Sequence, residues 1–142
     1  MKALILHGPN LNQLGKRNQT HYGILTLDDI NHLIIETYPD VMFDFFQSNS
    51  ESDIVNLLHQ VDNDYDFLVI NPGGLCHYSV VLRDAFELVG IPKAVVHLSD
   101  IVKREPFRQT DLLAPLSDVY IKGLKAQSYI QAIEAIIHKF HL

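Results

Sequence analysis

Side chains that could move protons gather in three polar stretches of the 142-residue chain, each directly after a short apolar segment. They offer a phenol, two imidazoles, guanidinium groups, amides and hydroxyls: Asn10, Asn12, Arg17, Tyr22, Asn71, His77, Ser79, His97, Ser99, Arg104 and Arg108. Such a set suits removal of a proton from a carbon next to a carbonyl group, with a general acid that assists a leaving group. The arginines and amides favour a small polyhydroxylated acid as the ligand.

The first polar stretch does not match the known nucleotide-binding loops. Six residues separate Gly8 from Gly15, where a Walker A motif needs four, and Arg17 replaces the Ser or Thr that would bind magnesium. No GxGxxG sequence follows the first apolar segment, so a dinucleotide fingerprint is absent. A phosphoreceiver domain would carry acidic residues where His7 and Asn71 stand.

The composition excludes further classes of protein. A formal net charge of −6 argues against a nucleic-acid binder, which needs a basic face. Cys76 is the single cysteine, so neither an intramolecular disulfide nor a cysteine zinc site is expected. His138 and His141 lack nearby carboxylate or thiol partners, which favours a solvated segment over a metal site. No apolar run reaches the length of a membrane span or resembles a signal peptide, and we expect a cytoplasmic protein.

The order of the apolar segments predicts a parallel α/β sheet. Runs of strand length, rich in β-branched and aromatic residues, lie at residues 3–6, 41–46, 67–70, 94–96 and 119–121. Segments with helical spacing separate them, and two of these begin at capping pairs, Thr26 with Asp29 and Ser50 with Asp53. The alternation predicts one doubly wound, flavodoxin-like domain over residues 1–142, with three α/β/α layers and strand order 2-1-3-4-5.

This sheet should bring the polar stretches together, because ligands of doubly wound sheets bind beyond the carboxyl ends of the strands. The two longest irregular stretches, residues 8–23 and 98–115, start at those ends, and loops of that length are usually functional. Taken alone, Asn10 is more typical of a turn and a single histidine of a structural hydrogen bond. Only their convergence at one edge of the sheet indicates a site.

Four segments of the chain also resemble, in order and spacing, the motifs of one enzyme family. They are HGPNLNQLGKR at residues 7–17 followed by Tyr22-Gly23, FQSN at 46–49, NPGG at 71–74 with His77, Ser79 and LRDA at 82–85, and HLS at 97–99 with REPFR at 104–108. Nearly the whole chain resembles the type II 3-dehydroquinate dehydratases in this way. The resemblance implies a flavodoxin-like fold, no metal or cofactor, and reversible anti elimination of water from 3-dehydroquinate through an enolate, which gives 3-dehydroshikimate.

The resemblance implies roles in catalysis and in substrate binding. Tyr22 would act as a tyrosinate base on the C2 proton, and Arg17 must favour the anion because a free phenol has a pKa of about 10. Asn10 would hold a water against the enolate oxygen, and His97 would protonate the departing C1 hydroxyl. The remaining residues would bind the substrate: Asn71, Ser99 and the Leu98 backbone amide its carboxylate, His77 and Arg108 its ring hydroxyls.

The resemblance also implies a homo-oligomer, because the family assembles as trimers grouped into dodecamers. Asp84 would reach into the site of a neighbouring subunit. The loop that carries Arg17 and Tyr22 would close over the substrate as a lid.

One departure from the family pattern keeps other hypotheses open. Most homologues carry Glu two residues before the acid histidine, and this chain has Val95 there. We therefore expect His97 to lack a carboxylate that orients its ring. The expected function is a lyase of the shikimate pathway of aromatic amino-acid biosynthesis. The alternatives are a catalytically weakened homologue that binds a shikimate-like acid, which Val95 favours, and a quinate-catabolic enzyme of the same fold.

Overall fold

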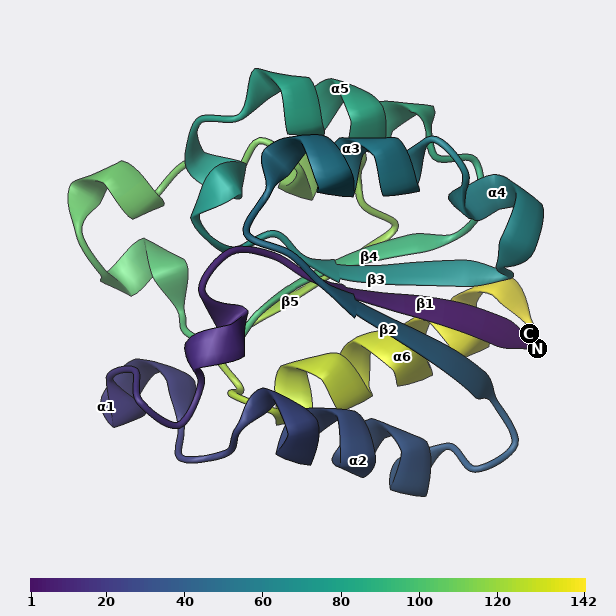
Figure 1. Cartoon of the computed structure of the whole chain (residues 1–142), viewed down its shortest axis with the longest axis horizontal. Coiled ribbons are helices and arrows are strands. Elements are labelled where there is room, and N and C mark those ends of the chain that lie inside the picture. Colours follow the sequence, from purple (N-terminus) through teal and green to yellow (C-terminus); the bar gives the residue numbers. More distant parts are fainter.

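The computed structural model describes all 142 residues, and its centre is a five-stranded parallel sheet (Figure 1). The strands are β1 (Lys2–His7), β2 (Met42–Gln47), β3 (Phe67–Asn71), β4 (Lys93–His97) and β5 (Val119–Lys122). Their order is β2-β1-β3-β4-β5, and every neighbouring pair is parallel. The predicted flavodoxin-like sheet is confirmed, and each strand begins and ends within one residue of its predicted bounds.

Helices cover both faces of the sheet. The α-helices are α1 (Gln19–Tyr22), α2 (Leu27–Thr37), α3 (Glu51–Leu58), α4 (Val61–Asp64), α5 (Val80–Leu88) and α6 (Gln127–Phe140). Figure 1 shows α3 and α5 on one face and α2 and α6 on the other, which gives the three expected layers. None of the helices combines the length and the apolar character that a membrane span requires.

Alternation of side chains along the strands divides the core into two apolar clusters. Ala3 and Ile5 of β1 join the cluster beside α2 and α6, whereas Leu4 and Leu6 join the cluster beside α3 and α5. All positions of β3 and β4 are buried, because these central strands are covered on both faces. The carboxyl ends of β3 and β4 therefore give the loops that follow them a rigid base.

Two of the helices begin at the predicted capping residues. The Thr26 hydroxyl accepts a hydrogen bond from the Asp29 amide at 3.1 Å, and the Asp29 carboxylate accepts one from the Thr26 amide at 3.0 Å. The Ser50 hydroxyl accepts from the Asp53 amide at 3.3 Å. A cap of this kind contributes about 1 kcal/mol to stability. The Thr26 cap also fixes the point at which the loop with Tyr22 ends.

The long loops contain short helices that the sequence patterns did not predict. Besides α1, they are the 3-10 helices η1 (Leu11–Gln13), η2 (Gly73–His77), η3 (Ile101–Lys103), η4 (Pro106–Arg108) and η5 (Ala114–Leu116). Each is five residues or shorter, which is too short for hydrophobic periodicity to be detected in the sequence.

Candidate active site

A pocket lies at the carboxyl ends of β3 and β4, between the long loops. It is lined by Leu11, Arg17, Tyr22, Asn71, Gly73, Gly74, His77, His97, Leu98, Ser99, Ile101, Arg104 and Arg108. Eight of the ten site residues expected from the sequence are among them. The exceptions are Asn10 and Asp84.

The loops after β1 and β3 form one wall of the pocket because glycines let their backbones touch. A Cβ atom at Gly8 would lie 2.7 Å from the carbonyl carbon of Pro72, a distance that real Cβ atoms do not show. The Gly8 amide also donates to the Asn71 carbonyl at 2.7 Å. Gly73 has φ +58°, and a Cβ there would lie 2.9 Å from the Pro9 carbonyl oxygen.

Tyr22 presents its hydroxyl to two guanidinium groups. Arg17 Nη2 donates to Tyr22 Oη at 2.7 Å, and Arg104 Nη1 donates to the same oxygen at 2.6 Å. The Arg17 guanidinium also lies over the phenol ring, 3.8 Å from its centroid. Tyr22 ends the single turn α1, whose cap is the Asn18 side chain. Two charged donors on one phenolic oxygen stabilise negative charge on it, as a tyrosinate base requires.

Three guanidinium groups converge on this part of the pocket. Burial lowers the pKa of Arg17, Tyr22 opposes that shift, and the charges of Arg104 and Arg108 add to it. An arginine stays protonated under such a shift, so the three positive charges repel one another. The Glu105 carboxylate, which is bonded to Arg108 and lies 3.9 Å from Arg104 Nε, compensates part of this charge. The arrangement suits both a phenolate and a carboxylate ligand.

Arg104 belongs to the matched REPFR segment, but sequence reasoning gave it no role. Its Nη1 lies 2.6 Å from Tyr22 Oη and 3.3 Å from Ser99 Oγ, so it connects the loop that carries Tyr22 to the carboxyl end of β4. Its Nε is the one buried side-chain nitrogen or oxygen without a hydrogen-bond partner. The available signal in the sequence was the position of Arg104 four residues before Arg108, within the same motif.

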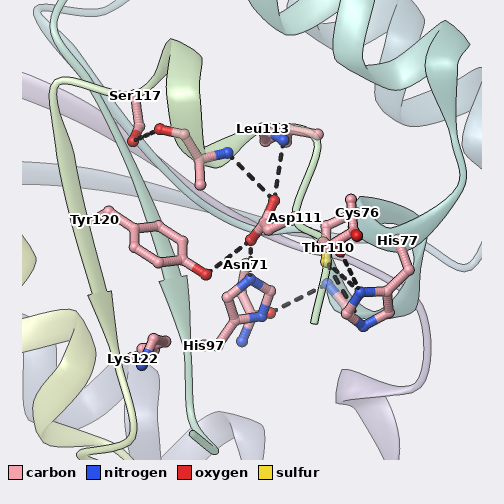
Figure 2. A network of polar contacts seen from close by, with 12 residues as sticks. Asn71, Cys76, His77, His97, Thr110, Asp111, Leu113, Ser117, Tyr120 and Lys122 are labelled. Atoms are coloured by element: carbon pink, nitrogen blue, oxygen red, sulfur yellow. Dashed lines mark hydrogen bonds and ion pairs between the residues drawn. The ribbon is translucent and has the colours of Figure 1, made fainter. Parts of the chain in front are cut away.

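His97, at the end of β4, is bonded to a carboxylate that the sequence analysis missed. Its Nε2 lies 2.7 Å from Asp111 Oδ2, and each side chain is only 5% exposed (Figure 2). The expectation that His97 lacks such a partner was therefore wrong. Val95 does occupy the position two residues earlier, buried in the apolar cluster beside α5. The partner instead comes from the loop before η5, fourteen residues along the chain, where no local pattern could reveal it.

Asp111 is itself held by four hydrogen bonds, most of them visible in Figure 2. Its Oδ1 accepts from the amides of Leu113 at 2.9 Å and Ala114 at 3.3 Å, and its Oδ2 accepts from the Tyr120 hydroxyl at 3.1 Å as well as from His97. Burial acts to raise the pKa of Asp111, but the His97 bond and charge, with the other donors, lower it below its ordinary value. The carboxyl group is therefore ionised.

The other pocket residues have fixed orientations. His77 Nδ1 donates to the Thr110 carbonyl at 2.8 Å, which orients the imidazole. Asn71 Oδ1 accepts from the Gly73 amide at 3.1 Å, which leaves the side-chain amide nitrogen as a donor. Ser99 and Leu98 are buried at the end of β4.

Asn10 and Asp84 lie outside the pocket. Asn10 is exposed with φ +69°, and its backbone amide donates to Asn49 Oδ1 at 2.9 Å. Asp84 is exposed on α5 and pairs with Arg83 at 2.8 Å. The expected place of Asp84 is the site of a neighbouring subunit. The proposed roles of Asn10 and Asp84 both stay predictions.

One group of side chains has the composition of a metal site. Cys76, His97 and Asp111 bring possible ligand atoms within 4.8 Å of one another. Burial raises the pKa of the Cys76 thiol, and the charge of Asp111 adds to that shift. In this environment the thiol stays protonated, so Cys76 takes part in the group as a neutral hydrogen-bonding side chain. We interpret the three side chains as an acid–base cluster.

Comparison with known proteins identifies the family. The model of the family "Dehydroquinase class II" matches residues 1–137. The 3-dehydroquinate dehydratase of Pelotomaculum thermopropionicum is 44% identical, over 95% of this chain and 95% of the relative. That of Thermotoga neapolitana is 46% identical, over 96% and 94%. The crystal structure of type II dehydroquinase from Butyrivibrio crossotus superposes with a TM-score of 0.91 at 36% identity, and covers 96% of this chain and 97% of that one. The chain belongs to the class II dehydroquinase family.

Proposed function

We propose that this protein is a hydro-lyase that converts 3-dehydroquinate into 3-dehydroshikimate by anti elimination of water, as an enzyme of the shikimate pathway. The observation that carries the proposal is the phenolic oxygen of Tyr22, held between Arg17 and Arg104 in the pocket that His97 also lines. The names of the curated relatives support the same substrate.

The reaction begins with proton removal. The Tyr22 phenolate takes the proton from C2, and the C–H electron pair forms an enolate with negative charge on the C3 oxygen. Arg17 and Arg104 stabilise the phenolate before the transfer. Asn10, from the first loop, holds a water against the enolate oxygen.

Loss of water follows. The enolate re-forms the ketone while its electron pair makes the C1=C2 bond and the C1–O bond breaks. His97 gives a proton to the departing hydroxyl, which leaves as water. Tyr22 has then gained one proton and His97 has lost one. Proton exchange with solvent removes the proton from Tyr22 and returns one to His97 before the next turnover.

Substrate binding uses the polar wall of the pocket. The amide of Asn71, the hydroxyl of Ser99 and the backbone amide of Leu98 bind the carboxylate, and the guanidinium groups nearby favour its charge. His77 and Arg108 bind ring hydroxyls. All five residues line the pocket, which supports this assignment.

A direct assay tests the proposal. Purified protein is mixed with 3-dehydroquinate, and the absorbance of the conjugated enone product is followed. We expect a rate proportional to protein concentration, and a rate lower by roughly 100-fold or more from Tyr22→Phe purified in the same way, which controls for a host enzyme. An absence of product from the wild type at every pH from 6 to 9 (roughly the range over which a base and an acid can both be active) contradicts the proposal.

We also propose a homo-oligomer, with trimers grouped into dodecamers and Asp84 completing a neighbour's site. Helix α5 supports it. Val80 and Leu88 are 59% and 71% exposed, and their spacing of four residues on either side of Asp84 places all three on one face of the helix. Exposed apolar residues grouped in this way mark a contact surface. A single domain over residues 1–142 and a cytoplasmic location stay predictions.

A further inference from the structure

We infer that Asp111 is the positioning residue for His97: it orients the imidazole so that one ring nitrogen faces the substrate, and it stabilises the charged ring that donates a proton. The inference rests on the proposed role of His97 as the general acid. Asp111 lies outside the motifs that the sequence shares with the family, and no role was expected for it.

The geometry fixes the ring on one side and leaves the other side free. Nε2 of His97 is bonded to Asp111 Oδ2 at 2.7 Å, whereas Nδ1 makes no hydrogen bond within the chain. His97 also lines the pocket, so its free nitrogen is the atom available to a ligand. Because Asp111 accepts from Leu113, Ala114 and Tyr120 as well, it cannot turn away from His97 without breaking those bonds.

Asp111 is the only ionised acid in contact with the ring. The Cys76 thiol from η2 and the Tyr120 hydroxyl from β5 lie close by, but burial raises the pKa of both groups and keeps them neutral. At 2.7 Å from Nε2, the Asp111 carboxylate can accept a charge-assisted hydrogen bond from the ring when the ring carries the proton to be donated. Asp111 therefore supplies the negative charge that a general acid at this position needs.

The remaining charged groups around His97 are cationic or already paired. Lys122 is its register partner on β5, and its Nζ lies 2.7 Å from Asp100. The guanidinium groups of Arg104 and Arg108 line the same pocket, and Arg108 is bonded to Glu105. Among these groups Asp111 is the one carboxylate bonded to the His97 ring.

A carboxylate beside the His97 ring could come from residue 95 or from residue 111. Val95 and His97 are two residues apart on β4, so their side chains point to the same face. Val95 and Leu113 belong to one apolar cluster, so the loop with Asp111 lies over the Val95 side of the strand. A carboxylate at position 95 would therefore lie on the same side of β4 as that of Asp111. A carboxylate from both would place two like charges in a buried space.

A reciprocal exchange tests the inference on the full chain. The four proteins are wild type, Asp111→Asn, Val95→Glu and the double variant Val95→Glu/Asp111→Asn. Asn keeps the oxygen that accepts from the Leu113 and Ala114 amides but cannot carry the negative charge. We expect Asp111→Asn to lower kcat on the order of 100-fold, with KM within about threefold, and to move the alkaline limb of the kcat–pH profile to lower pH. The matched control Asp44→Asn, on β2 at the opposite edge of the sheet, should leave both unchanged.

The double variant should regain at least a tenth of wild-type kcat and much of the alkaline limb, whereas Val95→Glu alone should gain no activity. A merely structural role for Asp111 predicts no such rescue. If Asp111→Asn does not fold, ¹⁵N NMR of the wild type tests the inference instead. The neutral His97 ring should carry its proton on Nε2, and a mixture of the two tautomers overturns the inference. So does an Asp111→Asn enzyme with wild-type kcat and pH profile. If the wild type itself fails to dehydrate 3-dehydroquinate, the proposed function fails, whatever the tautomer.

Discussion

At the scale of single residues, the two groups that we propose as base and acid are held in opposite electrostatic environments. Tyr22 faces the guanidinium groups of Arg17 and Arg104, and His97 faces the carboxylate of Asp111. The two guanidinium groups can donate to the phenolate that accepts a proton, and the carboxylate can accept from the imidazolium that donates one. Base and acid are therefore assigned by their surroundings.

Replacing Tyr22 by Phe should abolish turnover and leave ligand binding largely intact, because only the proton acceptor is lost. We expect kcat to fall by roughly 100-fold to 10,000-fold, the range for loss of a general base. Steady-state kinetics and calorimetric binding of the product measure the two effects. Tyr65→Phe, which removes a phenol bonded to Asp44 far from the pocket, is the control. A near-normal rate for Tyr22→Phe contradicts the mechanism.

Replacing Arg104 by Ala should lower kcat by about 10-fold to 100-fold, since a hydrogen bond to a charged partner contributes about 1.5–3 kcal/mol. Added guanidinium ion at low concentration should restore part of the rate, because it can occupy the space and bond to Tyr22. The kinetics of the variant with and without guanidinium provide the measurement. If the substitution raises KM alone and guanidinium has no effect, Arg104 binds substrate and does not support Tyr22.

The site residues that the sequence predicts lie within contiguous motifs, whereas the one that it does not predict lies outside them. Arg17, Tyr22 and His97 stand in contiguous motifs, so their spacing alone placed them in one pocket. Asp111 acts through a contact between two separate segments, β4 and the loop before η5, and it follows no motif. Val95 led to the expectation of a missing carboxylate, but the carboxylate that contacts His97 comes from a segment that only the tertiary structure brings near.

At the scale of secondary structure elements, β1 carries a buried polar group at its carboxyl end. His7 Nδ1 lies 2.8 Å from the Tyr129 hydroxyl of α6, and Nε2 lies 2.8 Å from Asn31 Oδ1 of α2. These bonds tie the sheet to both helices of one layer. Burial lowers the pKa of His7 from 6.5 to about 4, and the bond to Asn31 only partly opposes this.

The His7 environment should make stability depend on pH between 6.5 and 4. In that window the unfolded chain binds a proton at residue 7 and the folded chain does not, so the free energy of unfolding falls as pH falls. The pKa difference corresponds to about 3 kcal/mol in total. Urea denaturation at fixed protein concentration measures it. His7→Gln should flatten the dependence, and the exposed His32→Gln should not. Equal slopes for His7→Gln and wild type contradict the prediction.

The strands and long helices were predictable because apolar periodicity and caps such as Thr26 act locally. Single turns such as α1 and η4 were not, because they form where the surrounding loops bring Tyr22 and Arg108 to the pocket. Their stability comes from tertiary contacts rather than from helix propensity.

At the scale of the whole molecule, the exposed face of α5 should be a contact between subunits. Light scattering of the wild type should show a large oligomer, and Leu88→Glu should reduce its mass, because a charge would be buried in an apolar contact. Ile35→Glu, an exposed apolar position on α2, is the matched control and should keep the wild-type mass. A fully active wild-type monomer contradicts the role of Asp84.

The stereochemistry of elimination tests the central claim most directly, because the proposed chemistry requires Tyr22 and His97 to act on opposite faces of the substrate. The wild-type protein is given two samples of 3-dehydroquinate, each with deuterium at one of the two C2 positions, and the product is analysed by mass spectrometry. We predict that the deuterium anti to the C1 hydroxyl is lost and that the other is retained. Loss of the syn deuterium would contradict the account.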